Sequence, residues 1–231
     1  MLTRVAETLG HGIAAYSRWA VGSAEIVALG ALPPGPFVAV TWHSMNMLNL
    51  AVHARGRHHP YRAFVPPGFL GSTMHGWLVA SGMEPVALAQ DGVANPIGGL
   101  REMARALADG WSVGIALDGP HGPPRVLRPG ALWLARQSGK PLVVMGFAAW
   151  PSFRAPRWDR HLVPLPGARI AVAYGEPTII DRRAEIDEGL RSQISDSVDA
   201  AERRAWTLLD REPTAAGDGN DDTSDREGGP R

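Results

Sequence analysis

The chain has 231 residues, and its 23 lysines and arginines balance its 23 aspartates and glutamates. This length fits one α/β domain with a tail, and the charge balance argues against binding to nucleic acid. The absence of cysteine excludes disulfides, thiolate catalysis and cysteine-ligated zinc. No run in the sequence reaches the roughly 18 apolar residues that a membrane span needs.

The first half of the chain alternates between helix and strand patterns. Leu2–Val21 is predicted to be an amphipathic helix, because its apolar residues recur at helical spacing. The apolar run Pro36–Trp42 predicts a buried parallel strand that leads directly into His43. The other elements expected here are strands at Ala24–Leu29, Tyr61–Val65 and Pro85–Ala89, and helices at Ser44–Arg55, Ser72–Ser81 and Ile97–Ala108.

The second half continues the alternation. A buried strand at Trp111–Leu117 leads directly into the glycine- and proline-rich loop Asp118–Arg125. Trp150–Arg160 is predicted to be an aromatic and basic loop. Arg211–Arg231 holds six acidic and three basic residues and almost nothing to bury, so a disordered acidic tail is expected. The other expected elements are strands at Pro141–Phe147 and Ala168–Tyr174, and helices at Ala131–Gln137 and Glu185–Leu209.

Strands that alternate with helices indicate an α/β fold with a mainly parallel central sheet flanked by helices. We expect a single α/β domain at residues 22–210, preceded by the N-terminal amphipathic helix at 1–21 and followed by the tail at 211–231. Sheets of this kind bind ligands beyond the carboxyl ends of their strands. His43 and Asp118 each follow a predicted strand, so they are the leading candidates for chemistry.

The loop after the second buried strand has a binding chemistry of its own. Gly119 and Gly122 permit close approach of backbone amides, and Arg125 and Arg128 follow them. Together with His121, these residues are candidates to bind a phosphate or carboxylate group of a substrate. The alternative is a rigid turn between strand and helix, stiffened by three prolines, in which His121 faces solvent.

Several short strings recur in an order that resembles a known family. They are Trp42-His43, Asp118-Gly-Pro-His-Gly-Pro123, Pro129-Gly130, Leu134-Ala135, Ser138-Gly-Lys-Pro141, Trp158-Asp159 with Pro164 and Pro166, and Gly175-Glu-Pro177. Their ordered combination, over roughly residues 20–180, is similar to a bacterial branch of the lysophospholipid acyltransferase superfamily, long catalogued as a domain of unknown function. The resemblance implies a glycerolipid acyltransferase-like fold.

The resemblance also implies an activity. A fatty acyl group would move from acyl carrier protein or coenzyme A to a hydroxyl or amine of a lysolipid- or glycolipid-like acceptor. His43 would be the general base, because imidazole titrates near neutral pH and can return the acceptor's proton to the leaving thiolate. No metal or tightly bound cofactor is implied, and the partners would be the lipid acceptor and the acyl carrier. We expect a cytoplasmic protein, peripheral to the inner face of the membrane.

The chain departs from the superfamily pattern in two places. Better-known members carry His-x-x-x-x-Asp, whereas Leu48 stands five residues after His43. Asp118 is therefore the candidate to orient the imidazole, because both groups lie at the same edge of the predicted sheet. The strings at Gly71–Gly76 and Gln90–Asn95 replace the family's acidic residue and Arg-Gly-Ser-like string. Two alternatives stay open: an inactive lipid-binding or scaffold relative, and a thioester hydrolase that shares the histidine.

The aromatic and basic loop suits contact with a membrane, where rings lie at headgroup depth and arginines meet anionic lipid. The candidate lipid contacts are Trp150, Phe153, Arg154, Arg157 and Trp158. The alternative is a folded loop in which Trp158 belongs to the core and Asp159 pairs with a nearby arginine. The histidines His53, His58 and His59 lack the spacing of a helical zinc site, so no metal site is predicted.

Overall fold

The structure is a computed structural model that describes residues 2–56, 60–87, 89–90, 93–94, 96–119 and 122–211. These residues form one α/β domain, as predicted. The tail expected to be disordered lies outside the described residues apart from Arg211, and His58, His59 and His121 lie outside them too. Of the string Gln90–Asn95, only residues 90, 93 and 94 are described.

The strands of the main sheet are β1 (Glu25–Leu29), β2 (Val38–Thr41), β3 (Tyr61–Val65), β4 (Glu84–Ala87), β7 (Ser112–Ala116), β8 (Leu142–Arg154) and β9 (Leu162–Tyr174). Their order is β1-β9-β8-β2-β7-β3-β4. All neighbouring pairs are parallel except β8 and β9, which are antiparallel. A separate two-stranded sheet joins β5 (Ala89–Gln90) to β6 (Val93–Ala94). The prediction of a mainly parallel sheet is therefore confirmed.

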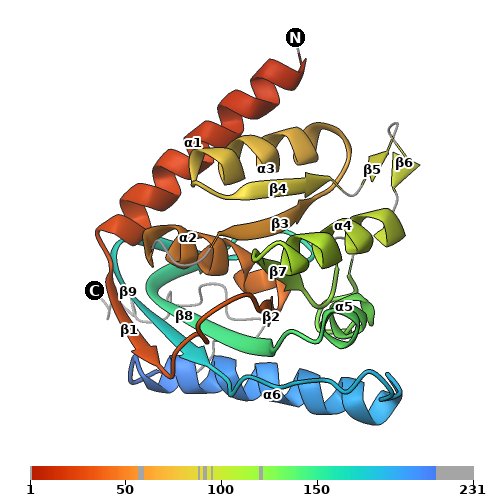
Figure 1. Ribbon diagram of the computed structural model, residues 1–231. Helices are drawn as coiled ribbons and strands as arrows, with labels where there is room; N and C mark the ends of the chain where they lie inside the picture. Colours follow the sequence, from red (N-terminus) through yellow and green to blue (C-terminus); the bar gives the residue numbers. More distant parts are fainter. Residues whose placement is uncertain are drawn as a thin grey trace, which may run out of the picture.

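The helices are α1 (Leu2–Gly22), the 3-10 helix η1 (His43–Met45), α2 (Asn46–Gly56), α3 (Gly68–Ala80), α4 (Pro96–Ala108), α5 (Gly130–Ser138) and α6 (Glu188–Thr207). Figure 1 shows α6 along one side of β8 and β9, with α1 and α2 on the other side. The helices α4 and α5 pack against each other next to β7 and β2. Helices therefore flank the sheet on both faces, as the alternating sequence pattern predicted.

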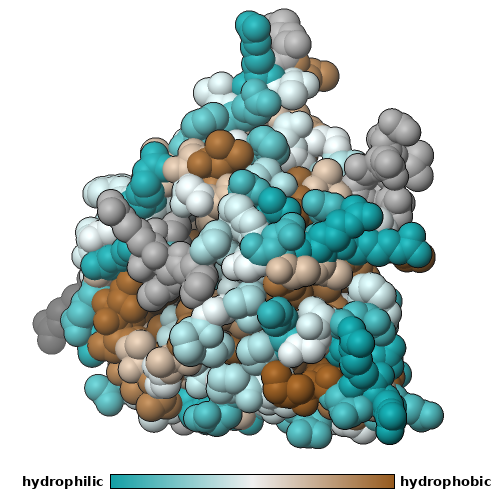
Figure 2. Space-filling view, viewed as in Figure 1, coloured by the Kyte–Doolittle hydropathy of each residue, from teal (hydrophilic) through white to brown (hydrophobic). Residues whose placement is uncertain are grey.

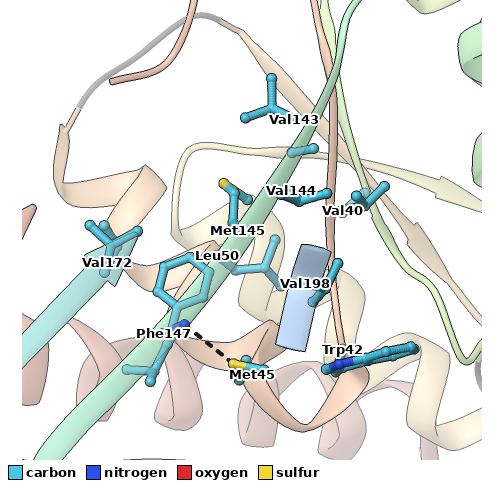
Figure 3. Packing of buried hydrophobic residues seen from close by; sticks show 14 of the residues in the cluster. Val40, Trp42, Met45, Leu50, Val143, Val144, Met145, Phe147, Val172 and Val198 are labelled. Atoms are coloured by element: carbon cyan, nitrogen blue, oxygen red, sulfur yellow. Dashed lines mark hydrogen bonds between the residues drawn. The ribbon is translucent and has the colours of Figure 1, made fainter. Parts of the chain in front are cut away.

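The core forms where the central strands meet α6 and α2. Every residue of β2 is buried, as are the first eight residues of β8, which is what continuous apolar runs predict for strands covered on both faces. Figure 3 shows Val40 and Val144 of these strands close to Val198 of α6, and Phe147 close to Leu50 of α2 and Val172 of β9. A Cβ atom at Gly146 would overlap the backbone of α6. The helix therefore lies directly on β8 at this glycine.

The region expected to be an aromatic and basic loop is largely strand. β8 continues to Arg154 and pairs with β9, so the connecting turn is limited to residues 155–161. Beyond Ala149, residues of β8 are exposed or half-buried, and a register shift lies between Trp150 and Ser152. The strand predicted at Pro141–Phe147 thus continues to Arg154, and of the added residues only Ala148 and Ala149 are buried.

The helix α1 packs against α3 through small residues. Ala6, Gly10 and Ala14 are buried, and a Cβ at Gly10 would overlap the backbone of α3. Five large apolar side chains of α1 are exposed instead: Leu2, Val5, Leu9, Ile13 and Trp19. Figure 2 shows apolar patches among the polar surface in the upper part of the molecule, where α1 runs. No helix in the described part of the chain has the length and apolar character to cross a membrane.

Candidate active site

His43 and Asp118 lie together at one edge of the sheet. Their strands β2 and β7 are parallel neighbours, with Thr41 opposite Ala116, so the residues that follow both strands meet at the same end. The backbone N–H of His43 donates to Asp118 Oδ1 at 2.8 Å. The backbone N–H of Arg125 donates to Asp118 Oδ2 at 3.1 Å. Asp118 thus ties the loop after β7 to the start of η1.

This geometry corrects the expected orienting partner of His43. Both oxygens of Asp118 accept hydrogen bonds from backbone amides, and the hydrogen bond that it receives from His43 comes from the main chain. The side chain of His43 contacts a different carboxylate. His43 Nδ1 lies 2.7 Å from Asp159 Oδ2, and Asp159 is in the turn of the β8–β9 hairpin.

A second imidazole shares this carboxylate. His161 Nδ1 also lies 2.7 Å from Asp159 Oδ2, which gives the His–Asp–His cluster of His43, Asp159 and His161. Burial alone would raise the pKa of Asp159, but the hydrogen bonds from His161 and His43 outweigh it and hold the pKa well below its usual range. The carboxylate is therefore ionised and can only accept hydrogen bonds. Each neutral imidazole then carries its proton on Nδ1 and has a free lone pair on Nε2.

Trp158 covers the imidazole of His43. The two ring centroids are 5.2 Å apart and the rings are tilted by 44°. The indole also meets Gly122, where a Cβ would lie 2.9 Å from two ring carbons. The φ angle of Gly122 is 69°, which also favours glycine. Trp158 is half-buried and belongs to the site. Only 14% of the His43 side chain is exposed.

The basic residues of the loop after β7 are engaged within the protein. Arg125 forms ion pairs with Asp199 and Glu202 of α6, each at 2.6 Å. Burial alone would lower the pKa of Arg125, but Glu202 and Asp199 raise it above its ordinary value. Arg128 donates to the carbonyl of Gly122 at 2.7 Å. The guanidinium of Arg125 is thus paired with two carboxylates, so its expected role in binding a substrate anion stays a prediction.

The same carboxylates of α6 hold neighbouring groups. Trp42 Nε1 donates to Asp199 Oδ1 at 2.6 Å, and Arg154 lies 3.9 Å from Glu202. Burial lowers the pKa of Arg154 from its ordinary value. This network fixes the residue before His43 and the outer part of β8 against the same helix. It therefore helps to hold His43 and the hairpin that carries Asp159 in one arrangement.

The remaining predicted lipid contacts lie on the hairpin. Trp150 and Phe153 are exposed, and the guanidinium of Arg211 lies over the Trp150 ring at 4.0 Å. The Nε of Arg157 is 3.6 Å from Asp159 Oδ1. Asp159 therefore does pair with a nearby arginine, as the folded-loop alternative predicted. It also binds the two imidazoles. Contact of the hairpin with lipid stays a prediction.

The sequence analysis did not predict that Asp159 pairs with His43 or that His161 belongs to the site. From the sequence, Asp159 was assigned to a family string and to a local pair with an arginine, and not to the side chain of His43. His161 stands in no recognisable pattern. Gly119 has a positive φ of 65° and permits the turn after Asp118. His121, which was expected to bind substrate, lies outside the described residues.

An apolar cavity of about 720 Å³ lies elsewhere, lined by β1, β9 and the segment from Gly30 to Phe37. Phe37 precedes β2 whereas His43 follows it, so the cavity is at the opposite end of that strand. None of its lining residues belongs to the His–Asp–His cluster. The polar cluster at the carboxyl end of β2 is therefore the candidate active site.

No protein-family model matches the chain. It is 26% identical over 136 residues to the uncharacterised protein RP090 of Rickettsia prowazekii, a match that covers 59% of this chain and 61% of that relative, less than two-thirds of its length. Among solved structures, the chain is similar to PlsC, the 1-acyl-sn-glycerophosphate acyltransferase from Thermotoga maritima. The TM-score is 0.52 at 16% identity, covering 88% of this chain and 80% of PlsC. The chain therefore has an acyltransferase-like fold.

Proposed function

We propose that the protein is an acyltransferase that moves a fatty acyl group from acyl carrier protein or coenzyme A to a hydroxyl or amine of a lysolipid- or glycolipid-like acceptor. The observation that carries the proposal is the 2.7 Å pair of His43 Nδ1 and Asp159 Oδ2 at the carboxyl end of β2. A histidine oriented by a buried carboxylate is the arrangement that a general base requires. The acyltransferase-like fold supports this choice of reaction.

The reaction follows from the contact between His43 Nδ1 and Asp159 Oδ2, which leaves Nε2 of the neutral ring to act as the base. Its Nε2 lone pair takes the proton of the acceptor as the acceptor oxygen or nitrogen attacks the thioester carbonyl. The tetrahedral intermediate then collapses, the carbon–sulfur bond breaks, and the imidazolium gives its proton to the leaving thiolate. Asp159 stabilises the imidazolium and keeps the ring proton on Nδ1. Trp158 packs against the imidazole, and only 14% of the His43 side chain is exposed; exclusion of water from a site favours transfer of the acyl group over its hydrolysis.

The exposed apolar side chains of α1 suit a protein that meets its lipid acceptor at a membrane surface. Leu9 and Ile13 are exposed on the side of α1 that does not pack on α3. A half-buried helix with such a stripe can lie at the boundary between headgroups and acyl chains. We therefore propose peripheral attachment through α1, which brings acceptors within reach of the catalytic edge.

The function is tested with the purified chain, radiolabelled acyl-CoA and acyl carrier protein donors, and a panel of lysolipids and glycolipids. We expect a labelled diacyl product that His43→Ala removes and the exposed His75→Ala leaves in place. Undiminished transfer by His43→Ala would exclude His43 as the base. Free fatty acid as the main product would instead identify a thioester hydrolase, and binding to lipid without any product would identify a non-catalytic relative.

A further inference from the structure

The His–Asp–His cluster gathers three groups that are also metal ligands. One ring nitrogen each of His43 and His161 and a carboxylate oxygen of Asp159 all lie within 4.8 Å of one another. The Asp159 side chain is fully buried, while 14% of His43 and 16% of His161 are exposed. The donor atoms are thus held on a buried anion and can be reached from the side of the two imidazoles.

The donor set matches zinc. Zn²⁺ binds neutral imidazole nitrogen and carboxylate oxygen, and sites with three protein ligands keep a fourth position open. With metal–ligand distances of about 2.0–2.1 Å, two ligands of a tetrahedral zinc lie about 3.3 Å apart. The Nδ1–Oδ2 distances are 2.7 Å, so each must widen by about 0.6 Å. The two ring nitrogens, which lie within 4.8 Å of each other, must approach by up to about 1.5 Å.

A second observation concerns the other oxygen of the Asp159 carboxylate. Asp159 Oδ1 is buried and has no hydrogen-bond partner among the described residues. The nearest cation is Arg157, whose Nε lies 3.6 Å from Oδ1. An ion bound by the cluster would give this oxygen a closer cation, and the charge of Arg157 would oppose that ion.

Metal binding and base catalysis exclude each other here. Zinc on Nδ1 needs the lone pair of that nitrogen, so the single proton of the neutral imidazole must move to Nε2. A protonated Nε2 cannot accept the proton of an acyl acceptor. We propose that the His–Asp–His cluster is a Zn²⁺ site whose occupation switches off the base function of His43. The inhibition rests on the proposed acyl transfer, whereas the binding of zinc does not.

Calorimetric titration of the full chain, freed of metal with EDTA and then desalted, measures the binding directly. We expect one zinc ion per chain. His161→Ala and Asp159→Asn should each weaken binding by more than about tenfold, and the exposed His75→Ala should leave it unchanged. Arg157→Ala should tighten binding by about threefold, because it removes a nearby positive charge. Circular dichroism confirms that each variant is folded.

In the acyl transfer assay, zinc should inhibit the wild type and EDTA should restore activity, while His161→Ala should need more than about tenfold more zinc for the same inhibition. Equal zinc affinity of the wild type and His161→Ala would overturn the site, and stimulation of transfer by zinc would overturn the inhibitory role. If no acyl transfer is found with any substrate, the proposed function fails, and the calorimetric comparison still decides the zinc site.

Discussion

Asp159 Oδ2 lies 2.7 Å from His43 Nδ1, although 116 residues separate the two in the chain. The β8–β9 hairpin brings the carboxylate to the end of β2, where its turn passes the imidazole. His161, two residues further on, binds the same oxygen. The negative charge of Asp159 is therefore shared between two imidazoles, and each ring is held with Nδ1 directed inward.

Asp159→Asn should lower kcat for acyl transfer by about 10²- to 10⁴-fold, because the amide cannot stabilise the imidazolium or hold the ring tautomer. KM should change little, since the proposed role lies in the chemical step. Steady-state kinetics on the wild type and variant measure both values. Asp187→Asn makes the same chemical change at the N-cap of α6 and should retain kcat. An unchanged kcat in Asp159→Asn would show that His43 works without this carboxylate.

Asp118→Ala should lower the free energy of unfolding by about 2–4 kcal/mol, because two backbone amides lose their acceptor. Asp118→Asn retains one carbonyl oxygen and should lose less. Urea denaturation followed by circular dichroism measures both changes. Asp109→Ala, at an exposed position, should stay within about 0.5 kcal/mol of the wild type. A stable Asp118→Ala variant would contradict the role of Asp118 as the tie between the two loops.

Gly146→Ala should destabilise the fold by about 3 kcal/mol or more, because the new Cβ overlaps the backbone of α6 where it lies on β8. The matched control is Gly12→Ala in α1, where a Cβ meets nothing within 4 Å. That change should stabilise the protein by about 0.5–1 kcal/mol through helix propensity. Thermal unfolding of the two variants should therefore shift in opposite directions. Equal shifts would mean that α6 does not lie directly on this glycine.

The double variant Leu9→Ser, Ile13→Ser should bind phosphatidylglycerol vesicles about tenfold more weakly than the wild type, because it removes apolar area from the proposed membrane face. Sedimentation with sucrose-loaded vesicles measures the bound fraction. Ile179→Ser, at an exposed apolar residue outside α1, is the control and should bind as the wild type does. If the double variant binds normally, the exposed stripe of α1 is not the attachment surface.

Two of the three tyrosines should resist ionisation in alkaline solution. Burial raises the pKa of Tyr61, partly offset by its hydrogen bond with Asn49, and burial raises the pKa of Tyr174. The folded pKa of each is raised, so their contribution to stability is complete below the unfolded value of about 10 and is lost above it, by about 1.4 kcal/mol per pH unit for each tyrosine. Ultraviolet titration should show Tyr61 and Tyr174 ionising only as the protein unfolds. Ionisation of these two tyrosines in the folded protein would contradict this burial.

The sequence was sufficient to predict that His43 and Asp118 share an edge of the sheet, because each follows an apolar run that only a buried parallel strand explains. It was insufficient for the partner of the imidazole. Asp159 reaches His43 through an antiparallel return of β9 beside β8, and the pairing partner of a strand is not encoded in its own alternation of apolar residues. Asp118 was assigned to the ring because a sequence does not show whether a carboxylate will meet a side chain or a backbone amide.

The position of Asp159 in the β8–β9 hairpin also determines when the site can form during synthesis of the chain. A ribosome makes His43 long before Asp159, with more than a hundred residues of chain between them, and domains complete their folding as the later segments emerge. Until β9 has been made and has paired with β8, the nascent chain holds an imidazole without its carboxylate. The proposed acyl transfer by His43 would thus begin only when the second half of the domain is in place.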